Sequence, residues 1–472
     1  MKKTLLSTIA AVALAANDTT ELESLKAQMA QMQQLMQTMQ QKINTLETAK
    51  KPAATAVETS NDTTAGSSFM AATEKAASLL DLSLILDASY VSRSKKDEAL
   101  QHLELPGVAH GLIGSHSHGE HSHATYNASN GFNLNYAEMA IHSTVDPYLD
   151  ADAVFHFSEN GVEIEEAYFT TTTLPAGLRL RGGKFLSEFG RLNNQHHHYW
   201  SFSDMPLVYE AFLGNHGINE IGAQLQWTAP TDTFLMFGFE ALQGKNEAMF
   251  GQAAIANPYD EEELLSGSAP QPSLLVAYAK TSFDIGNTSL LAGASYANGK
   301  SRLNHFEDEE PHAFAGESDL FGIDFTLKHY FDSYSSLTWQ SEWLYRDMEG
   351  TQFADQDGDL TTEDMATASM HKKQAGYYTQ LVYAPNQSWK VGARYDNVYQ
   401  NDVIANGADQ NKPKNMEQIS AMVEYNSSEF ARYRLQYTHS DALFNEEEQR
   451  QNLDSVIFSV NLAIGRHGAH AF

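Results

Sequence analysis

Beyond about residue 80, apolar and polar residues alternate with a period of two, and this pattern limits the fold more than any other feature of the chain. A period of two is that of a β-strand, whose successive side chains point to opposite faces. In the first such segment, Leu82 and Leu84 alternate with Asp81 and Ser83. The pattern recurs to the C-terminus in about sixteen segments of about ten residues, which is the length of a tilted membrane strand.

The polar faces of these segments carry charged residues, such as Glu220 in one segment and Glu342 and Arg346 in another. Charged faces on so many strands cannot pack into a dry core, because desolvating them costs too much free energy. They can line water while the apolar faces contact lipid. The pattern therefore predicts an all-β fold, a transmembrane barrel of about sixteen antiparallel strands over residues 79–472. A large secreted β-sandwich or β-helix is the soluble alternative.

The connections between the segments alternate in length. Short turns follow every second segment, and most of the other connections are long and polar: 93–130, 186–216, 245–272, 300–317, 347–372 and 401–414. Barrels of the bacterial outer membrane have short periplasmic turns and long outer loops. An even number of strands would also return the C-terminus to the periplasmic side.

The first 78 residues predict export and self-association. Residues 1–15 have the charged start, short apolar stretch and A-x-A site of a secretory signal peptide. Residues 18–48 contain four heptads with Leu, Met and Ile at the a and d positions, which predicts a periplasmic α-helical coiled coil. A single amphipathic helix resting on a partner is the alternative. Residues 49–78, rich in Ala, Thr and Ser, predict a flexible linker.

Composition and motifs exclude several classes of function. The net charge of -30 argues against a nucleic-acid partner, which needs a cationic face. The chain has no cysteine, so disulfides, thiolate metal sites and a cysteine nucleophile are excluded. It also lacks Gly-x-Ser-x-Gly, His-Glu-x-x-His and a phosphate-binding glycine loop, and we therefore do not expect an enzyme.

The signal peptide, coiled coil, linker and sixteen strands together resemble Gram-negative porins, especially the phosphate-selective porin O/P family. The segment 178–191 is similar to the strand of that family that leads into a pore-narrowing loop. The resemblance implies an outer-membrane location and a homotrimer, assembled here through residues 22–46. It also implies a water-filled channel for small hydrophilic solutes or ions. The family's lysine- and arginine-rich lumen, however, contrasts with the acidic balance of this chain.

Loop 93–130 is rich in histidine, and imidazole favours Zn, Cu and Ni. The candidate metal ligands are His110, His116, His118, Glu120, His121 and His123. We expect no required cofactor, with Zn²⁺ as a transported or loop-bound ion. Histidine-rich barrels also resemble zinc-regulated outer-membrane receptors. A TonB-dependent-like zinc receptor and a non-transporting structural barrel that tethers the envelope are therefore alternative functions, although the chain has no room for a globular plug.

Loop 186–216 is the third loop along the chain if the short Glu159-Asn160 link counts as the second, and in porins the third loop sets the pore constriction. The candidate constriction residues are Glu188, Arg191, His196, His197, His198 and Asp204. Trp200 and Phe212 suggest that the loop packs against the wall. A buried structural cluster is the alternative for the three histidines.

Arginines at inward positions predict a basic strip in the lumen: Arg179, Arg181, Arg394, Arg432 and Arg434. Opposite acidic loop residues, such a strip would create a transverse electric field. Acidic runs at 260–263, 307–310 and 446–448 are typical of solvated loops, and they can also hold divalent cations that bridge to lipopolysaccharide. The expected partners are therefore outer-membrane lipid, lipopolysaccharide and the barrel assembly machinery.

Overall fold

The computed structural model describes most of the chain beyond residue 80. The described ranges are 81–109, 126–159, 161–246, 248–258, 263–265, 267–306, 311–355, 365–445 and 447–465. They belong to the second of two compact units, Ala72–Phe472. The predicted signal peptide, coiled coil and linker lie outside the described residues, as do His110, His116, His118, Glu120, His121 and His123.

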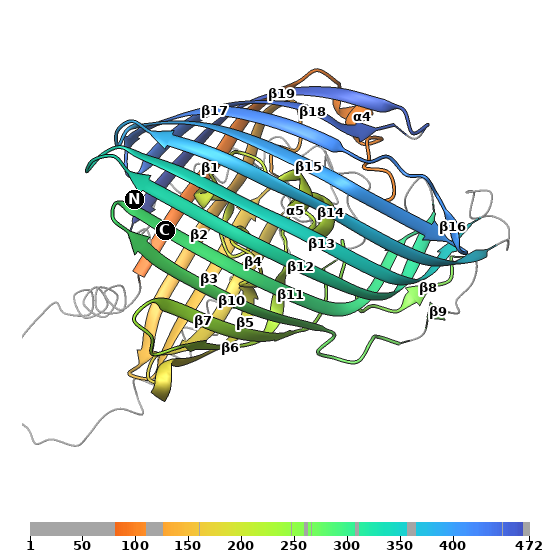
Figure 1. Ribbon diagram of the computed structural model, residues 1–472, viewed down its shortest axis with the longest axis horizontal. Helices are drawn as coiled ribbons and strands as arrows, with labels where there is room; N and C mark the ends of the chain where they lie inside the picture. The colour runs from red at the N-terminus through yellow and green to blue at the C-terminus, as the bar shows by residue number, and fades with distance from the viewer. Residues whose placement is uncertain are drawn as a thin grey trace, which may run out of the picture. The chain divides into compact units, whose positions relative to one another are not determined.

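Sixteen antiparallel strands form the wall of a closed barrel (Figure 1). They are β1 (Asp81–Arg93), β2 (Gly131–Asp146), β3 (Leu149–Ser158), β4 (Gly161–Thr171), β5 (Leu178–Leu186), β6 (Asn219–Thr228), β7 (Phe234–Leu242), β10 (Leu274–Ile285), β11 (Thr288–His305), β12 (His312–Tyr330), β13 (Ser336–Ala354), β14 (Ala366–Ala384), β15 (Trp389–Ala405), β17 (Met416–Ser428), β18 (Ala431–Phe444) and β19 (Arg450–Gly465). Strands β1 and β19 pair from Ser83↔Gly465 to Arg93↔Ser455, which closes the sheet. The all-β barrel predicted from the alternation is confirmed.

The remaining elements are short and lie in the connections. Strands β8 (Ile255–Ala256) and β9 (Glu263–Leu265) pair with each other, and β16 (Ala408–Asp409) pairs with β15. In the described part of the chain, the helical elements are α4 (Asp97–Leu100), η1 (Pro175–Gly177), η2 (His197–Tyr199) and α5 (Leu207–Leu213). Within the ranges described above, no helix has the length and apolar character needed to cross a bilayer.

The wall has an apolar outer face and a polar inner face. Leu82 and Leu225 are 45% and 47% exposed, whereas Gln224 and Glu342 are each 1% exposed. Rings of Tyr, Trp and Phe also cluster beside the short turns, where Trp389 and Tyr425 lie 4.8 Å apart. This arrangement reverses that of a water-soluble protein and fits a wall surrounded by lipid, with aromatic rings near its edge.

The interior of the barrel is occupied by the segment 187–217, which we call the inner loop. Figure 1 shows its helix α5 inside the wall, and α5 contacts β14 and β15. Phe189, Val208 and Phe212 are fully buried and belong to one apolar cluster with inward wall residues such as Leu344 and Val398. The predicted packing of this loop against the wall is therefore confirmed.

A second segment lies over the inner loop on the side of the long connections. Leu100, Leu103 and Leu105 join the same apolar cluster. Arg346 of β13 donates to the carbonyl of Val108 at 2.7 Å and stacks on Phe212 at 4.4 Å. Residues 97–109 thus cover part of the inner loop.

Candidate functional site

The inner loop leaves the wall and returns to it at a single point. Strand β5 ends at Leu186 and β6 begins at Asn219, and these two residues are cross-strand neighbours. The side chain of Asn193 donates to the carbonyls of Ser187 and Ile218 at 2.9 and 3.0 Å and accepts from the Ile218 amide at 2.8 Å. The two ends of the loop are therefore tied together at its base.

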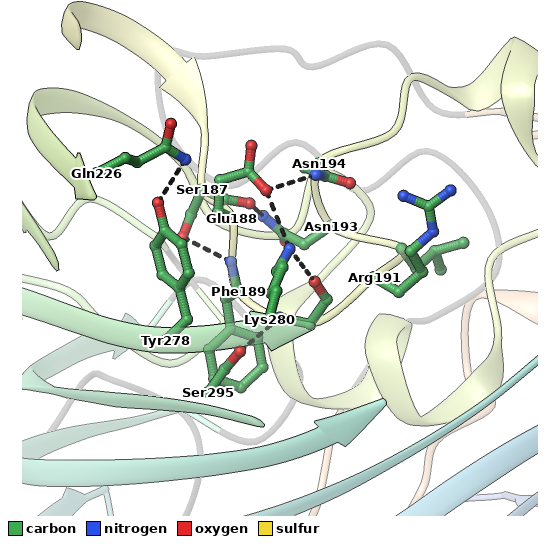
Figure 2. Close-up of polar contacts among 12 residues, drawn as sticks. Ser187, Glu188, Phe189, Arg191, Asn193, Asn194, Gln226, Tyr278, Lys280 and Ser295 are labelled. Carbon is green, nitrogen blue, oxygen red and sulfur yellow. Dashed lines mark hydrogen bonds and ion pairs between the residues drawn. The ribbon is translucent and has the colours of Figure 1, made fainter. Parts of the chain in front are cut away.

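The first turn of the loop is held by acidic and basic side chains of the wall. Glu240 of β7 accepts hydrogen bonds from the hydroxyl of Ser187 and the amide of Glu188. Figure 2 shows Asn194 and Lys280 converging on the carboxylate of Glu188, with distances of 2.7 and 3.0 Å. Burial alone would raise the pKa of Glu188, but Lys280, Arg181 and Asn194 together outweigh it and lower that pKa.

Glu342 of β13 is the most heavily bonded anchor of the loop. Its carboxylate accepts from the amides of Arg191 and Leu192 at 2.8 and 2.9 Å. It also accepts from the hydroxyls of Tyr209 and Tyr378 at 2.6 and 2.5 Å. Gly190, beside these groups, has φ +63°, and a Cβ there would lie 2.2 Å from the Tyr209 hydroxyl. The backbone can therefore approach Glu342 only because residue 190 is glycine.

The second half of the loop is anchored on β15. Asp396 accepts from the amide of Leu207 at 3.0 Å, at the first residue of α5. Arg394 donates to Asp396 at 2.8 Å and to the carboxylate of Asp204 at 2.9 Å, and it stacks on Phe202 at 4.8 Å. A charged pair from the wall therefore holds both the backbone and a side chain of the loop.

The five arginines do not form one basic strip. Arg432 and Arg434 of β18 donate to the carbonyls of His198 and Trp200, and Arg434 also pairs with Glu424 at 2.6 Å. Together with Arg394 they act as loop anchors, because carboxylates and loop carbonyls occupy their donors. Arg179 and Arg181 lie on β5, in another part of the wall, where Arg181 stacks on Tyr168 at 4.5 Å.

The three consecutive histidines turn toward β1–β4. His197 is buried, stacks on Tyr126 at 4.1 Å and lies 3.4 Å from the Tyr136 hydroxyl. Burial lowers the pKa of His198 to about 4, although Glu138 opposes this effect. Burial would also lower the pKa of His196, but Glu138 and Glu166 outweigh it and raise that pKa to about 10. The histidines therefore differ in charge despite being neighbours.

A polar cavity of about 90 Å³ remains between the inner loop and β17–β19. Its lining includes the charged residues Arg93, Asp204 and Glu210. It also includes the hydroxyl groups of Thr438, Ser440 and Ser455. Burial and the neighbouring Asp204 raise the pKa of Glu210 to about 8. The cavity has room and polar partners for several water molecules.

All six predicted constriction residues lie on the loop that enters the barrel, but their partners in the wall were not predicted from the sequence. The missed residues are Glu138, His156, Glu165, Glu166, Glu240, Lys280 and Asp396. Each faces the interior of the barrel, and strand parity is the signal that could have found them, except that a β-bulge is needed to bury both of the consecutive residues Glu165 and Glu166.

Comparison with known proteins gives a close relative in sequence and distant ones in structure. An uncharacterised protein of Aquifex aeolicus (strain VF5) is 44% identical over 395 residues, which are 84% of this chain and 80% of that protein. No family model matches the chain.

Similar solved structures are outer-membrane proteins, and each match covers 82% of this chain. The anion-selective porin of Comamonas acidovorans matches over 99% of its length, with a TM-score of 0.48 and 10% identity. OmpT of Vibrio cholerae matches over 97%, with a TM-score of 0.46 and 9% identity. The channel DcaP of Acinetobacter baumannii matches over 96%, with a TM-score of 0.44 and 10% identity.

Proposed function

This chain belongs to the same family as the Aquifex aeolicus protein, and from its barrel we propose that it is an outer-membrane channel whose conductance is set by the inner loop. The channel would pass small hydrophilic solutes or ions. The observation that carries this proposal is the docking of one loop to inward side chains around the barrel, including Glu240, Glu342, Asp396 and Gln436.

The physical support is the reversed distribution of polarity. An apolar outer face with exposed Leu and Phe side chains is stable in lipid, and closure of the sheet leaves no unpaired edge there. A wall that served only as a tether would need no polar interior. Here the inner face carries hydrogen-bonded carboxylates and guanidinium groups, which are the groups that line and narrow aqueous pores.

Single-channel recording in planar bilayers tests the proposal. We expect discrete conductance steps from the purified protein, and larger steps from a variant in which residues 188–217 are replaced by a short Gly-Ser link between β5 and β6. Gel mobility before and after heating would verify that both barrels are folded. Silent bilayers with both folded proteins would contradict the channel function and favour the non-transporting structural barrel.

The selectivity of the channel follows from the charges near the remaining cavity. Asp204 and Glu210 oppose Arg93 there, and the whole chain carries -30. We propose that the channel prefers cations. These cations would include metal ions that the histidines of loop 93–130 collect. The sign of the reversal potential in a KCl gradient tests this preference. Dependence of zinc uptake on the inner-membrane energy complex would favour the TonB-dependent-like receptor instead.

Assembly as a homotrimer through residues 22–46 is a further proposal, supported by the heptads of 18–48. Sedimentation of the isolated peptide 18–48 tests it. Replacing Met32 and Met39 by Asp should abolish self-association, since it places charges in the heptad seam. A wild-type peptide that is already monomeric at high micromolar concentration would exclude this role.

A further inference from the structure

A cluster of histidines and glutamates joins the inner loop to the wall at β2–β4. Glu138 of β2 and His156 of β3 are direct cross-strand neighbours, and both face the interior at 3% and 2% exposure. His196 and His198 of the inner loop approach the same carboxylate from the other side. Four side chains from three separate segments therefore meet at one carboxylate oxygen.

The spacing of these groups is that of metal ligands. The Oε2 atom of Glu138 lies 3.2 Å from Nε2 of His156, 3.6 Å from Nδ1 of His196 and 3.3 Å from Nδ1 of His198. Ligand atoms of Glu138, His156 and His196 all lie within 4.8 Å of one another. In a tetrahedral zinc site with bonds of about 2.0–2.2 Å, two ligand atoms are about 3.3 Å apart. Only small movements would be needed to enclose an ion.

Two further carboxylates face the ring nitrogens of His156 and His196 that point away from Glu138. Glu166 of β4 lies 2.9 Å from Nε2 of His196, and Glu165 lies 3.7 Å from Nδ1 of His156. A β-bulge between the pairs Val154↔Glu166 and Phe155↔Ile164 allows these consecutive glutamates both to be buried. Histidine ligands of metals are usually oriented by such a carboxylate on the nitrogen that does not bind the metal.

One atom of the cluster points to something that the protein alone does not supply. Nδ1 of His196, the nitrogen that lies 3.6 Å from Oε2 of Glu138, is buried and has no hydrogen-bond partner. Among the described residues, the ion-pair partners of Glu138 are histidines and not Lys or Arg. Three carboxylates, those of Glu138, Glu165 and Glu166, are buried in this cluster, and a bound divalent cation would offset their negative charge.

We propose that Glu138, His156 and His196 bind one divalent transition-metal ion, with His198 as a neighbouring donor, and that this ion fastens the inner loop to the wall. Imidazole with carboxylate suits Zn²⁺ and other late first-row metals. The ion is a permanent clamp inside the barrel, distinct from any ion passing through the channel. The site does not depend on conduction, so it stands or falls separately from the channel function.

Zinc binding by the full-length folded protein in detergent tests the site. The starting protein carries Ala at His110, His116, His118, His121 and His123, which removes the other candidate zinc site. After treatment with EDTA, we expect this protein to take up one Zn²⁺ per chain in competition with a chromophoric chelator. Glu138→Gln and His196→Gln should each weaken binding more than tenfold. Glu166→Gln, which alters only one of the two further carboxylates, should weaken it about 10–100-fold.

His371→Gln is the matched control, because His371 also pairs with a carboxylate, that of Asp347 at 2.7 Å, but lies away from the cluster on β14. Its zinc affinity should be unchanged. X-ray absorption of the bound zinc should show histidine nitrogen neighbours. Failure of the starting protein to bind zinc, or unchanged affinity in folded His196→Gln and Glu166→Gln, would overturn the proposal. The three test substitutions lie in three different segments, so misfolding of one variant leaves the others informative.

Discussion

Replacing Glu342 by Ala should release the first half of the inner loop without unfolding the barrel. The carboxylate accepts four hydrogen bonds, two from the loop amides of Arg191 and Leu192 and two from the hydroxyls of Tyr209 and Tyr378. It lies on the inner face of β13, whose backbone pairing with β12 and β14 does not involve the side chain. The substitution therefore affects docking of the loop and leaves the wall paired.

The expected magnitude follows from the donors that lose their acceptor. Hydroxyl groups can rotate toward other acceptors, whereas the two amides are fixed by the backbone. A buried donor without a partner costs about 1–3 kcal/mol, so two amides cost about 4 kcal/mol. This free energy corresponds to about a thousandfold shift in the equilibrium between the docked and the undocked loop. Glu342→Gln keeps an acceptor oxygen and should show a smaller effect.

Hydrogen–deuterium exchange of the folded protein in detergent measures this shift. Peptides that cover 187–200 should exchange two to three orders of magnitude faster in Glu342→Ala, because exchange reports local opening. Glu349→Ala is the control, since Glu349 lies on the same strand but is exposed. Unchanged protection of 187–200 in a folded Glu342→Ala barrel would refute the assignment of Glu342 as the main anchor.

Three further predictions concern the wall, the loop backbone and pH. Leu225→Lys should reduce the free energy of membrane assembly by about 2–4 kcal/mol, because it places a charge in lipid. Ser83→Lys, whose side chain faces the lumen, should be tolerated, and heat-dependent gel mobility compares the two variants. Gly190→Ala should undock the loop, since the new Cβ would collide with Tyr209, and increased conductance or proteolysis of the loop would reveal the undocking. Gly267→Ala is a spatial control, because a Cβ there meets no atom within 4 Å. Burial raises the pKa of Glu210 to about 8, so the docked loop holds a proton that the undocked loop releases. Docking should therefore weaken as pH rises from about 4.5 through 8. Glu210→Gln should remove this dependence in exchange measurements at pH 6 and pH 9.

The wall could be predicted from the sequence because each strand meets two different solvents. Phe458 faces outward and Ser459 inward, and the contrast between them is visible in the letters alone. The count of strands follows from the repetition of this contrast and the turns between segments. Packing details do not alter it, since lipid accepts almost any apolar side chain.

The interior could be predicted only in part. Aromatic residues revealed that loop 186–216 enters the barrel, but several of its partners are distant in sequence. Glu342 lies 151 residues beyond Arg191, and Gln436 lies 233 residues beyond Ser203. The alternation of side chains along a strand predicts that these residues face inward, but it does not predict which loop atom each one contacts. The arginines show the same limit, because Arg394 and Arg434 face inward as predicted but are occupied by Asp396 and Glu424.

The cluster at β2–β4 was invisible for a related reason. Glu138 and His156 are separated by a turn, and neither stands out in its own segment. Their meeting depends on strand register, and the approach of His196 depends on the path of the loop. Sequence patterns describe single segments well, whereas sites made from three segments require the assembled barrel.

The direct pairing of Leu186 with Asn219 means that the inner loop behaves as a removable insert. The strands on either side of it are already neighbours, so the wall has the same register whether this insert is long, short or absent. Mutation or recombination can therefore exchange it without rebuilding the tube. Relatives could acquire different permeabilities through this one position, and an engineered sensor could carry a ligand-binding peptide there.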